Sequence, residues 1–568
     1  MRIDAAAHLP EVAYFTMEVA LDQSMPTYSG GLGVLAADTL RAAGDLRAPM
    51  IGVTLLHRAG YFRQRLDAVG NQTEEPREWD PGAFLTPLPE RARIVIEGRD
   101  VALMAWRLAV EGRGGHPVPV YFLDTDLPEN DPLDRSLTGT LYGGDRRYRL
   151  CQEVVLGMGG VAILKALGHE PGLFHMNEGH SALLSLSLLA EEIGTRDPSS
   201  ATPEERERVR RRCVFTTHTP VPAGHDRFSA DLVHGVLGEK QARSLESAGC
   251  LRDGELNMTC LGLRCSHYVN GVSMRHEKIS EGMFPEYPFD SITNGVHAET
   301  WTSGPLKELF DRYVPEWRRD NRYLRYAVSI PRDEVMDAHR AAKELLLREV
   351  ESRTGAALDP AALTLGFARR ATPYKRHALI FSDIERLRRI VKEAGPAQFV
   401  FGGKAHPNDE AGKAVIREVF GIARALEGEI PVVYLEDYDL ELAGLVTAGV
   451  DLWLNTPRKP HEASGTSGMK AALNGVPSLS VLDGWWVEGH VEGVTGWSVG
   501  DPWNVESDDV RESRSLYEKL ETAILPLFRA APDEYARVMR TAIALNGSFF
   551  NAQRMVSQYV ENAYLPDA

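Results

Sequence analysis

The sequence predicts an α/β protein built from two doubly wound domains, each formed around a mostly parallel sheet. Short apolar strands alternate with helical stretches in both halves of the 568-residue chain, and this alternation is typical of parallel sheets. Residues 300–335 are rich in charged and aromatic side chains and contain no clear strand, so they separate the two runs. We therefore expect domains over residues 1–325 and 326–545, followed by a helix over 546–568 that packs back on the first domain.

The first half opens with an apolar strand over residues 12–15, a glycine-rich turn (Gly30-Gly31-Leu32-Gly33) and a helix over residues 34–41. A hairpin is expected around Gly98-Arg99-Asp100, because apolar runs flank these turn residues. Further short apolar runs predict strands over residues 50–55, 93–96, 101–108, 118–123, 173–176, 214–217 and 291–293.

The second half begins with a helix over residues 331–353. Val335, Ala342, Leu346 and Val350 share one face of this helix, and Gly355 supplies a stop signal. Shorter helices are expected over residues 469–473 and 551–564. Apolar strands are predicted over residues 363–368, 398–401, 432–434, 451–454 and 479–482.

The charge balance opposes nucleic acid as a partner. Lys and Arg number 63 against 80 Asp and Glu, which gives a net charge of −17, whereas phosphate backbones attract basic surfaces. No run of about 18 apolar residues occurs, so no membrane-spanning helix is expected. The N-terminus lacks the apolar stretch of a secretory signal. The sequence therefore predicts a cytoplasmic protein that binds neither nucleic acid nor membranes.

The cysteines and histidines do not predict a metal site. Cys250, Cys260, Cys265 and His267 lie close together in the sequence, but their spacing matches no common zinc pattern. Five cysteines in a chain of this length also argue against a disulfide framework. The sequence contains no GxSxG, HExxH or GxxxxGK[ST] motif, which removes the commonest serine-hydrolase, zincin and P-loop interpretations.

Two candidate ligand-binding segments follow predicted strands of the second half. The strand that ends at Ala368 leads into the cationic segment 369–376, which is either a phosphate-binding cluster or a solvated charged turn. The strand that ends near residue 454 leads into a turn with Glu462, a run of small residues and Lys470. This turn opens a helix, whose first backbone N–H groups can bind anions. The alternative is a Gly/Ser loop with an exposed lysine.

The first half offers complementary polar groups. The glycine-rich turn at residues 30–33 also opens a helix and would give an anion uncharged donors across a cleft. His175 and His180 are five residues apart and do not share a helical face, so they are expected to form hydrogen bonds in a polar pocket or in the core. Asn270-Gly271 and Asn294-Gly295 are turn signals with short amide side chains.

Eight segments, in this order from about residue 11 to residue 560, resemble the α-glucan phosphorylases, the family of glycogen, starch and maltodextrin phosphorylases. The chain is most similar to a short prokaryotic branch of that family. The segments are YSGGLGVLAAD, HMNEGHSALL, FTTHTPVPAGHDRF, YVNGVSMRH, TNGVHAETW, RRATPYKR, EASGTSGMKAALNG and LDGWWVEG.

This resemblance implies a retaining glycosyltransferase of the GT-B fold, whose two Rossmann-like domains face a central cleft. Such an enzyme uses pyridoxal 5′-phosphate. Inorganic phosphate cleaves the terminal α-1,4-glucosyl bond of the glucan and releases α-glucose 1-phosphate, in a reversible reaction. The first domain would bind the glucan and carry the glycine-rich phosphate loop, and the second would carry the cofactor lysine. A homo-oligomer is also compatible with the resemblance.

The resemblance also assigns roles by motif position. The catalytic residues would be Lys470, which binds the cofactor covalently, together with Arg370, Lys375 and His218. The cofactor would also contact Tyr438, Thr466, Gly465 and Gly31. The substrates would contact Gly30, Gly31, Leu32, Arg369, Glu178, His180, Asn270, Glu462, Ser464 and Gly465.

The chain departs from the larger phosphorylases at several positions. Ala20 stands where they have a tyrosine against the cofactor, and Trp485-Trp486 replace a smaller pair that either stacks on sugar or fills the core. The alternative function is a GT-B glucan synthase that uses a nucleotide-glucose donor. Those enzymes share the Arg370–Lys375 spacing but carry a second Glu eight residues after the first, where this chain has Lys470. A non-catalytic glucan-binding scaffold would need neither this lysine nor the cationic cluster.

Overall fold

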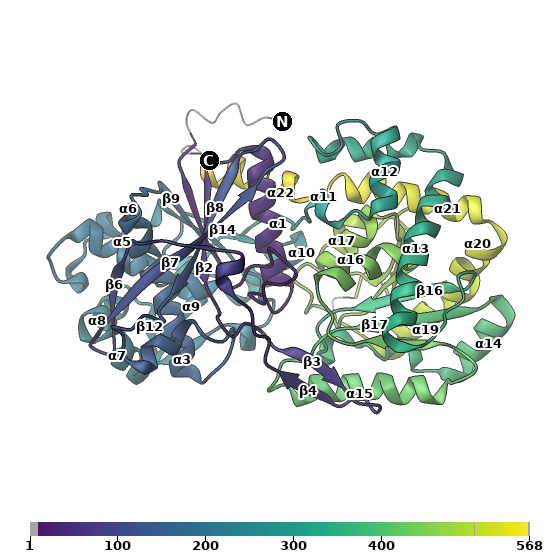
Figure 1. The fold of residues 1–568 in the computed structure, drawn as a ribbon, viewed down its shortest axis with the longest axis horizontal. Coiled ribbons are helices and arrows are strands. Elements are labelled where there is room, and N and C mark those ends of the chain that lie inside the picture. Colours follow the sequence, from purple (N-terminus) through teal and green to yellow (C-terminus); the bar gives the residue numbers. More distant parts are fainter. Residues whose placement is uncertain (1–8, 502, 505, 566–568) are drawn as a thin grey trace.

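The computed structural model describes residues 9–501, 503–504 and 506–565. Two α/β halves lie side by side, the first drawn in purple and blue and the second in green (Figure 1). Each half is organised around a mainly parallel sheet. The predicted α/β class with two mainly parallel sheets is therefore confirmed.

The sheet of the first half has the order β15-β14-β10-β9-β1-β2-β8-β7-β5, and β6 also pairs with β7. The strands from β15 to β8 run parallel, whereas β7 runs antiparallel to β8. The chain therefore builds outward from β1 through β2 to β8 and then returns past β1 to β9. The strands are β1 (Val12–Phe15), β2 (Met50–Leu55), β5 (Thr86–Pro87), β6 (Ala92–Ile96), β7 (Arg99–Glu111), β8 (Pro117–Asp124), β9 (Leu173–Asn177), β10 (Cys213–Thr216), β14 (Tyr268–Gly271) and β15 (Asp290–Ser291).

The sheet of the second half is parallel and has the order β18-β17-β16-β19-β20-β21. Here too the chain first builds outward in one direction, from β16 to β18, and then continues on the other side of β16, so the strand order reverses between β16 and β19. Open α/β sheets bind ligands beyond the carboxyl ends of their strands at such reversal points. Ligand sites are therefore expected beyond the carboxyl ends of β1/β9 and β16/β19. The strands are β16 (Leu363–Ala368), β17 (Ala397–Gly402), β18 (Val432–Leu435), β19 (Leu452–Asn455), β20 (Ser478–Val481) and β21 (Gly496–Val499).

Helices flank both sheets and fill the connection between them. In the first half and the connection they are α1 (Gly31–Leu46), α2 (Pro132–Arg135), α3 (Arg146–Val154), α4 (Gly160–Ala166), α5 (Leu184–Ile193), α6 (Pro203–Arg210), α7 (Ala230–Leu237), α8 (Glu239–Ser247), α9 (Met258–Arg264), α10 (Met274–Met283), α11 (Ala298–Trp301), α12 (Gly304–Tyr313) and α13 (Arg332–Thr354). In the second half they are α14 (Ile384–Ala394), α15 (Glu410–Ala425), α16 (Leu440–Gly449), α17 (Thr466–Leu473), α18 (Trp486–Gly489), α19 (Asp509–Lys519), α20 (Leu525–Ala530), α21 (Pro532–Thr541) and α22 (Ala552–Tyr559).

Some elements differ from the sequence-based expectation. Asn270-Gly271, read as a turn, forms the end of β14, where Asn270 pairs with Thr216 and Asp290 in the buried sheet. The expected strand over residues 291–293 is instead β15, one residue earlier and shorter. In each case tertiary packing overrides the weak local propensity.

The C-terminal segment packs against the first half. Helix α22 packs against α1 (Figure 1). The hydroxyl of Tyr564 lies 2.6 Å from Nδ1 of His175 on β9, and that of Tyr559 lies 3.0 Å from Oγ1 of Thr216 on β10. These contacts join residues 389 and 343 positions apart, whereas the domain boundaries at residues 325 and 545 stay predictions.

A hairpin of the first half reaches over the second. It consists of β3 (Arg63–Leu66) and β4 (Gln72–Glu75), and it lies beside α15 (Figure 1). The buried side chain of Gln64 donates to the carbonyl of Gly403 at 2.9 Å and accepts from the amide of Asp437 at 3.0 Å. Gln72 donates to the carbonyl of Ala405 and accepts from its amide, both at 2.9 Å. The hairpin thus ties the loops after β17 and β18 to the first half.

Among the described residues, no helix combines the length and the apolar composition needed to cross a membrane. The five cysteines are free. Within the same described part of the chain, no three His, Cys, Asp or Glu side chains gather closely enough to hold a metal ion.

Candidate active site

The two candidate segments of the second half meet at the order reversal of its sheet. Strand β16 ends at Ala368 and is followed by Arg369 and Arg370, while the neighbouring β19 ends at Asn455 and leads to Glu462. The side chain of Arg369 donates to Oδ1 of Asn455, so the two strand ends are linked directly. The cationic segment and the turn before α17 therefore form one polar cluster.

Glu462 is the centre of this cluster. Its carboxylate accepts from Nζ of Lys375 at 2.9 and 2.7 Å and lies 2.8 Å from Nη2 of Arg369. Burial raises the pKa of Glu462, but the two cations outweigh it and hold the pKa below its usual value. Glu462 is thus a buried, ionised carboxylate with two cationic partners.

Arg370 differs from its neighbour, because among the described residues its guanidinium has neither an ion pair nor a hydrogen-bond partner. Surrounding protein lowers its pKa, but nearby Tyr374, Glu18, Tyr61 and Tyr142 more than compensate, and the pKa lies above its usual value. A Cβ atom added to Gly30 would lie 3.2 Å from Nη2 of Arg370. This cation of the second half therefore touches the glycine-rich turn of the first and is available to an anion.

Glu18 shapes the glycine-rich turn. Its carboxylate accepts from the amides of Ser29 at 2.6 Å and Gly30 at 3.2 Å, and from the hydroxyl of Tyr142 at 2.9 Å. The predicted donor at Gly30 is therefore already engaged. Helix α1 begins at Gly31, so the amides of Gly31 and Leu32 lie in the first turn, where no intrahelical acceptor exists. These two amides are the donors that the turn can offer to a ligand.

Lys470 lies within α17, not at its start as expected from a helix over residues 469–473. Gly465 precedes the helix with φ 89°, a left-handed conformation that glycine adopts readily. Lys470 is 7% exposed, and its Nζ lies 3.5 Å from the centre of the Trp301 ring. Burial lowers the pKa of Lys470 to about 8. About a tenth of this amine is therefore neutral, and nucleophilic, at pH 7.

His218 and Glu178, two predicted site residues of the first half, lie together near the β1/β9 reversal point of its sheet. Nε2 of His218 lies 2.6 Å from Oδ1 of Asn177, and the backbone amide of His218 donates to Glu178 at 2.7 Å. Burial lowers the pKa of His218 to about 3, so its imidazole is neutral. Burial also raises the pKa of Glu178, whose φ of 82° is rare for a residue with a side chain.

Asn270 is less available than predicted, whereas Nδ1 of His180 is buried without a hydrogen-bond partner among the described residues. Nε2 of His180 faces Asp226 at 3.4 Å, and burial lowers the pKa of this histidine to about 3. Asn270 is fully buried, accepts from Oγ1 of Thr216 at 2.8 Å and donates to the hydroxyl of Tyr559 at 3.1 Å. Both polar atoms of Asn270 are therefore engaged inside the first half, which speaks against a contact with sugar.

Asn294 is a candidate that sequence reasoning missed. Its side-chain oxygen is buried and has no hydrogen-bond partner within the described residues. Asn294 carries the same Asn-Gly signal as Asn270, so the sequence alone gave no reason to prefer one over the other. An unpaired buried acceptor is costly unless a ligand or water satisfies it.

The remaining predicted positions surround Lys470 and Glu462. Thr466 is the first residue of α17, and Oγ of Ser464 is buried without a hydrogen-bond partner in the described part of the chain. The half-buried Tyr438 lies next to Gly402 at the end of β17, and its burial raises the pKa of the phenol. Ala20 is buried, and its amide donates to the carbonyl of Gly33 in the glycine-rich turn.

Trp485 and Trp486 belong to the core. They are 2% and 0% exposed, and a Cβ atom on Gly468 would lie 2.8 Å from the Trp485 ring. The ring therefore packs directly on α17. Of the two readings of this pair, the structure favours core filling over stacking on sugar.

We predict that Asp483 makes stability fall as pH rises. Burial, with a smaller effect of the Glu462 charge, raises its pKa from 3.8 to about 7, although the backbone amide of Glu462 donates to this carboxyl and opposes the rise. The fold therefore favours the protonated acid, and stability present below pH 4 is lost between about pH 4 and 7. The difference in unfolding free energy between Asp483→Asn and wild type should therefore be roughly 2–4 kcal/mol more in favour of the variant at pH 7.5 than at pH 4. Urea unfolding at both pH values measures this change.

The exposed Asp337 provides a matched control, because Asp337→Asn removes the same charge from a surface ion pair with Arg340. We expect no pH-dependent difference for that variant. Parallel pH profiles for wild type and Asp483→Asn would contradict the assignment of a protonated acid.

Comparisons with known proteins agree on one family. A family model described as "Carbohydrate phosphorylase" matches residues 213–495. The chain is 40% identical to the maltodextrin phosphorylase of Thermococcus litoralis, over 97% of this chain and 70% of that protein. It is 36% identical to the glycogen phosphorylase of Mycobacterium tuberculosis, over 99% and 72%, and 34% identical to the glycogen phosphorylase of Aquifex aeolicus, over 97% and 86%.

Proposed function

The chain belongs to the carbohydrate phosphorylase family, and from that premise we propose that it is an α-1,4-glucan phosphorylase of the GT-B fold. Its substrates would be inorganic phosphate and the terminal glucosyl unit of glycogen or maltodextrin, and its product α-glucose 1-phosphate. The observation that carries this proposal is Arg370 of the second half, which has no ion-pair or hydrogen-bond partner among the described residues and lies against the glycine-rich turn of the first half. The active site would then occupy a cleft between the halves.

The residues present fit pyridoxal 5′-phosphate. A carbonyl group needs a neutral amine, and Lys470 is buried, has a lowered pKa and lacks a hydrogen-bond partner among the described residues. Lys470, Tyr438, Thr466, Gly465 and Gly31 would hold the group. When bound, it supplies a phosphate that can exchange a proton with substrate phosphate near neutral pH.

The cations and amides of the site would bind the substrate phosphate. Arg370 offers a planar guanidinium that no described residue pairs with, and the amides of Gly31 and Leu32 offer uncharged donors. Lys375 and Arg369 add positive charge next to Glu462. Together these groups would stabilise two phosphates in close proximity, which is the main electrostatic demand of the reaction.

The sugar would be held by Ser464 and Asn294, whose side-chain oxygens have no hydrogen-bond partner in the described part of the chain, and by the cation-paired Glu462. Glu462 and Ser464 would accept and donate hydrogen bonds to its hydroxyls, and Asn294 would offer the buried oxygen that Asn270 cannot. The segment with His218 and Glu178 would line the other wall. In this arrangement substrate phosphate gives its proton to the leaving glycosidic oxygen, and one phosphate oxygen forms the new bond to the anomeric carbon with retention.

An assay with the 568-residue chain tests this function. The protein is supplied with pyridoxal 5′-phosphate and incubated with phosphate and a ladder of maltooligosaccharides. We expect α-glucose 1-phosphate to form and each oligosaccharide to shorten by one unit. Both changes should require phosphate and should be absent in the Lys470→Ala variant.

The same preparation distinguishes the alternative. Glucosyl transfer from ADP-glucose or UDP-glucose onto the oligosaccharides, without glucose 1-phosphate formation in the first assay, would establish a glucan synthase and overturn the proposal.

A further inference from the structure

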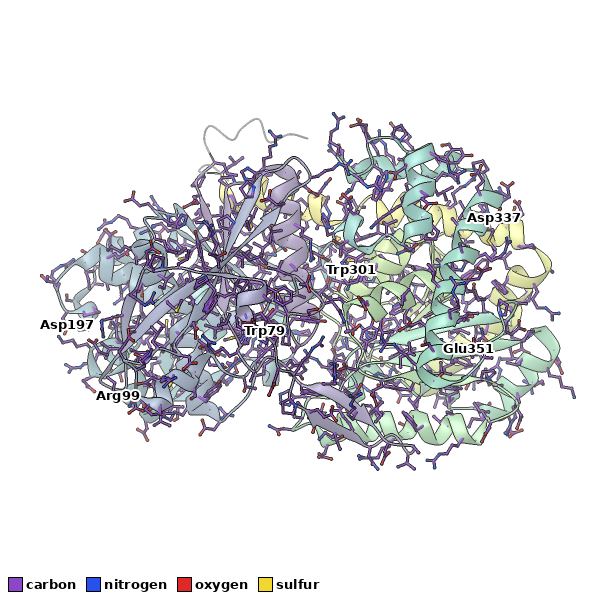
Figure 2. The ribbon with its side chains drawn as sticks, viewed as in Figure 1. Trp79, Arg99, Asp197, Trp301, Asp337 and Glu351 are labelled. Atoms are coloured by element: carbon purple, nitrogen blue, oxygen red, sulfur yellow. The ribbon has the colours of Figure 1, made fainter. Side chains whose placement is uncertain are left out.

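Three buried residues from separate elements meet behind the candidate active site. The carboxylate of Asp38 on α1 accepts from the indole Nε1 of Trp301 on α11, at 3.1 and 2.8 Å. Nζ of Lys470 on α17 lies 3.5 Å from the centre of the same indole ring. Trp301 lies between the two halves of the molecule (Figure 2). Asp38 and Lys470 therefore contact one aromatic ring, the first through its edge and the second through its face.

The ring is held firmly. Trp301 is 3% exposed and Asp38 is 1% exposed. The amide side chain of Asn474 donates to the carbonyl of Trp301 at 2.8 Å and to that of Lys470 at 2.9 Å, so it connects the two backbones. Arg41 lies 3.6 Å from Asp38 and donates to the carbonyl of Leu21, which anchors the carboxylate from behind. The ring has little freedom to rotate away from the amine.

This arrangement favours one orientation of the indole ring, with an ammonium group on its face and a carboxylate at its N–H. An ammonium group over an indole face is attracted by the ring electrons, and desolvation strengthens that attraction. A carboxylate at the indole N–H fixes the plane of the ring. Elements near Lys470 also carry Arg41, Glu299 and Glu441, but among the described residues the charge that raises its pKa is that of Asp38.

We propose that Asp38 is a positioning residue that acts through the indole of Trp301 to fix the amine of Lys470 and to support its positive charge. The inference rests on the proposed function, in which this amine binds a carbonyl group. It assigns Asp38 no contact with substrate or cofactor. Ala20, at the position of the missing aromatic side chain, packs beside the same helix α1 through Gly33.

The sign of the expected effect follows from the opposing influences on Lys470. Burial lowers the pKa of its amine, and the charge of Asp38 raises it again, with a net value of about 8. Asp38→Asn removes the charge but keeps an oxygen that can accept from the indole. The amine should then lose its proton at lower pH, while the ring keeps its place.

Reductive methylation with formaldehyde and cyanoborohydride measures this change in the 568-residue chain from which any cofactor has been removed. The rate is followed by mass spectrometry on the peptide that contains Lys470. Methylation at pH 7 should be about fivefold faster in Asp38→Asn, as expected if the pKa falls by about one unit. The plateau rate at high pH should match that of wild type.

Asp45→Asn is the matched control. Asp45 lies on the same helix, is also largely buried and pairs with His297 at 3.0 Å, but it does not influence Lys470. We expect an unchanged methylation profile. The same rate at pH 7 in wild type and Asp38→Asn would overturn the proposal, as would equal acceleration in both aspartate variants.

Trp301→Phe tests the same proposal if Asp38→Asn does not fold. The phenyl ring keeps an aromatic face but has no N–H for Asp38. If the indole fixes the amine, the plateau rate at high pH should change at least threefold, and an unchanged plateau and midpoint would contradict the proposal. Methylation does not depend on phosphorolysis, so failure of this inference and failure of the proposed function are separate results.

Discussion

We expect Lys470→Ala to abolish both phosphorolysis and covalent retention of pyridoxal 5′-phosphate. The amine of Lys470 is buried and has a pKa of about 8, so at neutral pH it is ready to bind a carbonyl group. Treatment of wild type with borohydride should fix the mass of the cofactor on the peptide that contains Lys470. The variant should show no such mass and at least a thousandfold lower rate of glucose 1-phosphate formation, equivalent to about 4 kcal/mol.

Lys165→Ala is a suitable control, because the side chain of Lys165 is largely exposed and lies in the first half. It should retain both the label and the activity. Cofactor mass on a different lysine peptide of wild type would contradict the assignment, and so would normal turnover of Lys470→Ala.

We expect Arg370→Ala to remove nearly all phosphorolysis without destabilising the fold. Since the guanidinium has no hydrogen-bond or ion-pair partner among the described residues, its loss breaks no internal hydrogen bond or ion pair there. The substrate phosphate, in contrast, would lose its main unshared cation. The expected fall in kcat/KM for phosphate is about a thousandfold, or about 4 kcal/mol, and the urea midpoint should stay within experimental error.

Arg369→Ala separates this role from a structural one. Arg369 already pairs with Glu462 and donates to Asn455, so its removal should lower stability as well as activity. Near-normal turnover of Arg370→Ala would remove Arg370 from the catalytic residues. A fall in stability as large as that of Arg369→Ala would show that Arg370 has a structural partner.

Fully buried strands were the elements that the sequence predicted best. The runs 12–15, 50–55 and 363–368 coincide with β1, β2 and β16, because strands covered on both faces are continuously apolar. Strand β14 was missed, since Asn270 and Gly271 signal a turn and only the pairing with β10 makes them extended. Strand β21 was also missed, because it begins at Gly496 and a glycine does not signal a strand.

The candidate site was predictable where it follows strand ends and not where it depends on distant contacts. The cluster of Arg369, Lys375 and Glu462 arises because the ends of neighbouring parallel strands meet at one edge. The engagement of Gly30 by Glu18, and the burial that separates Asn270 from Asn294, required the three-dimensional structure. Identical dipeptides can differ in availability only through their surroundings.

The hairpin of β3 and β4 constrains how such an enzyme could exchange a polymer at every turnover. Rotation of the halves away from each other would strip Gln64 and Gln72 of backbone partners in the loops after β17 and β18, and would expose buried amides together. Admission of a glucan chain end by a wide hinge rotation of the two halves is therefore disfavoured. Glucan ends would instead thread into a preassembled chamber, with smaller displacements of individual loops governing their passage.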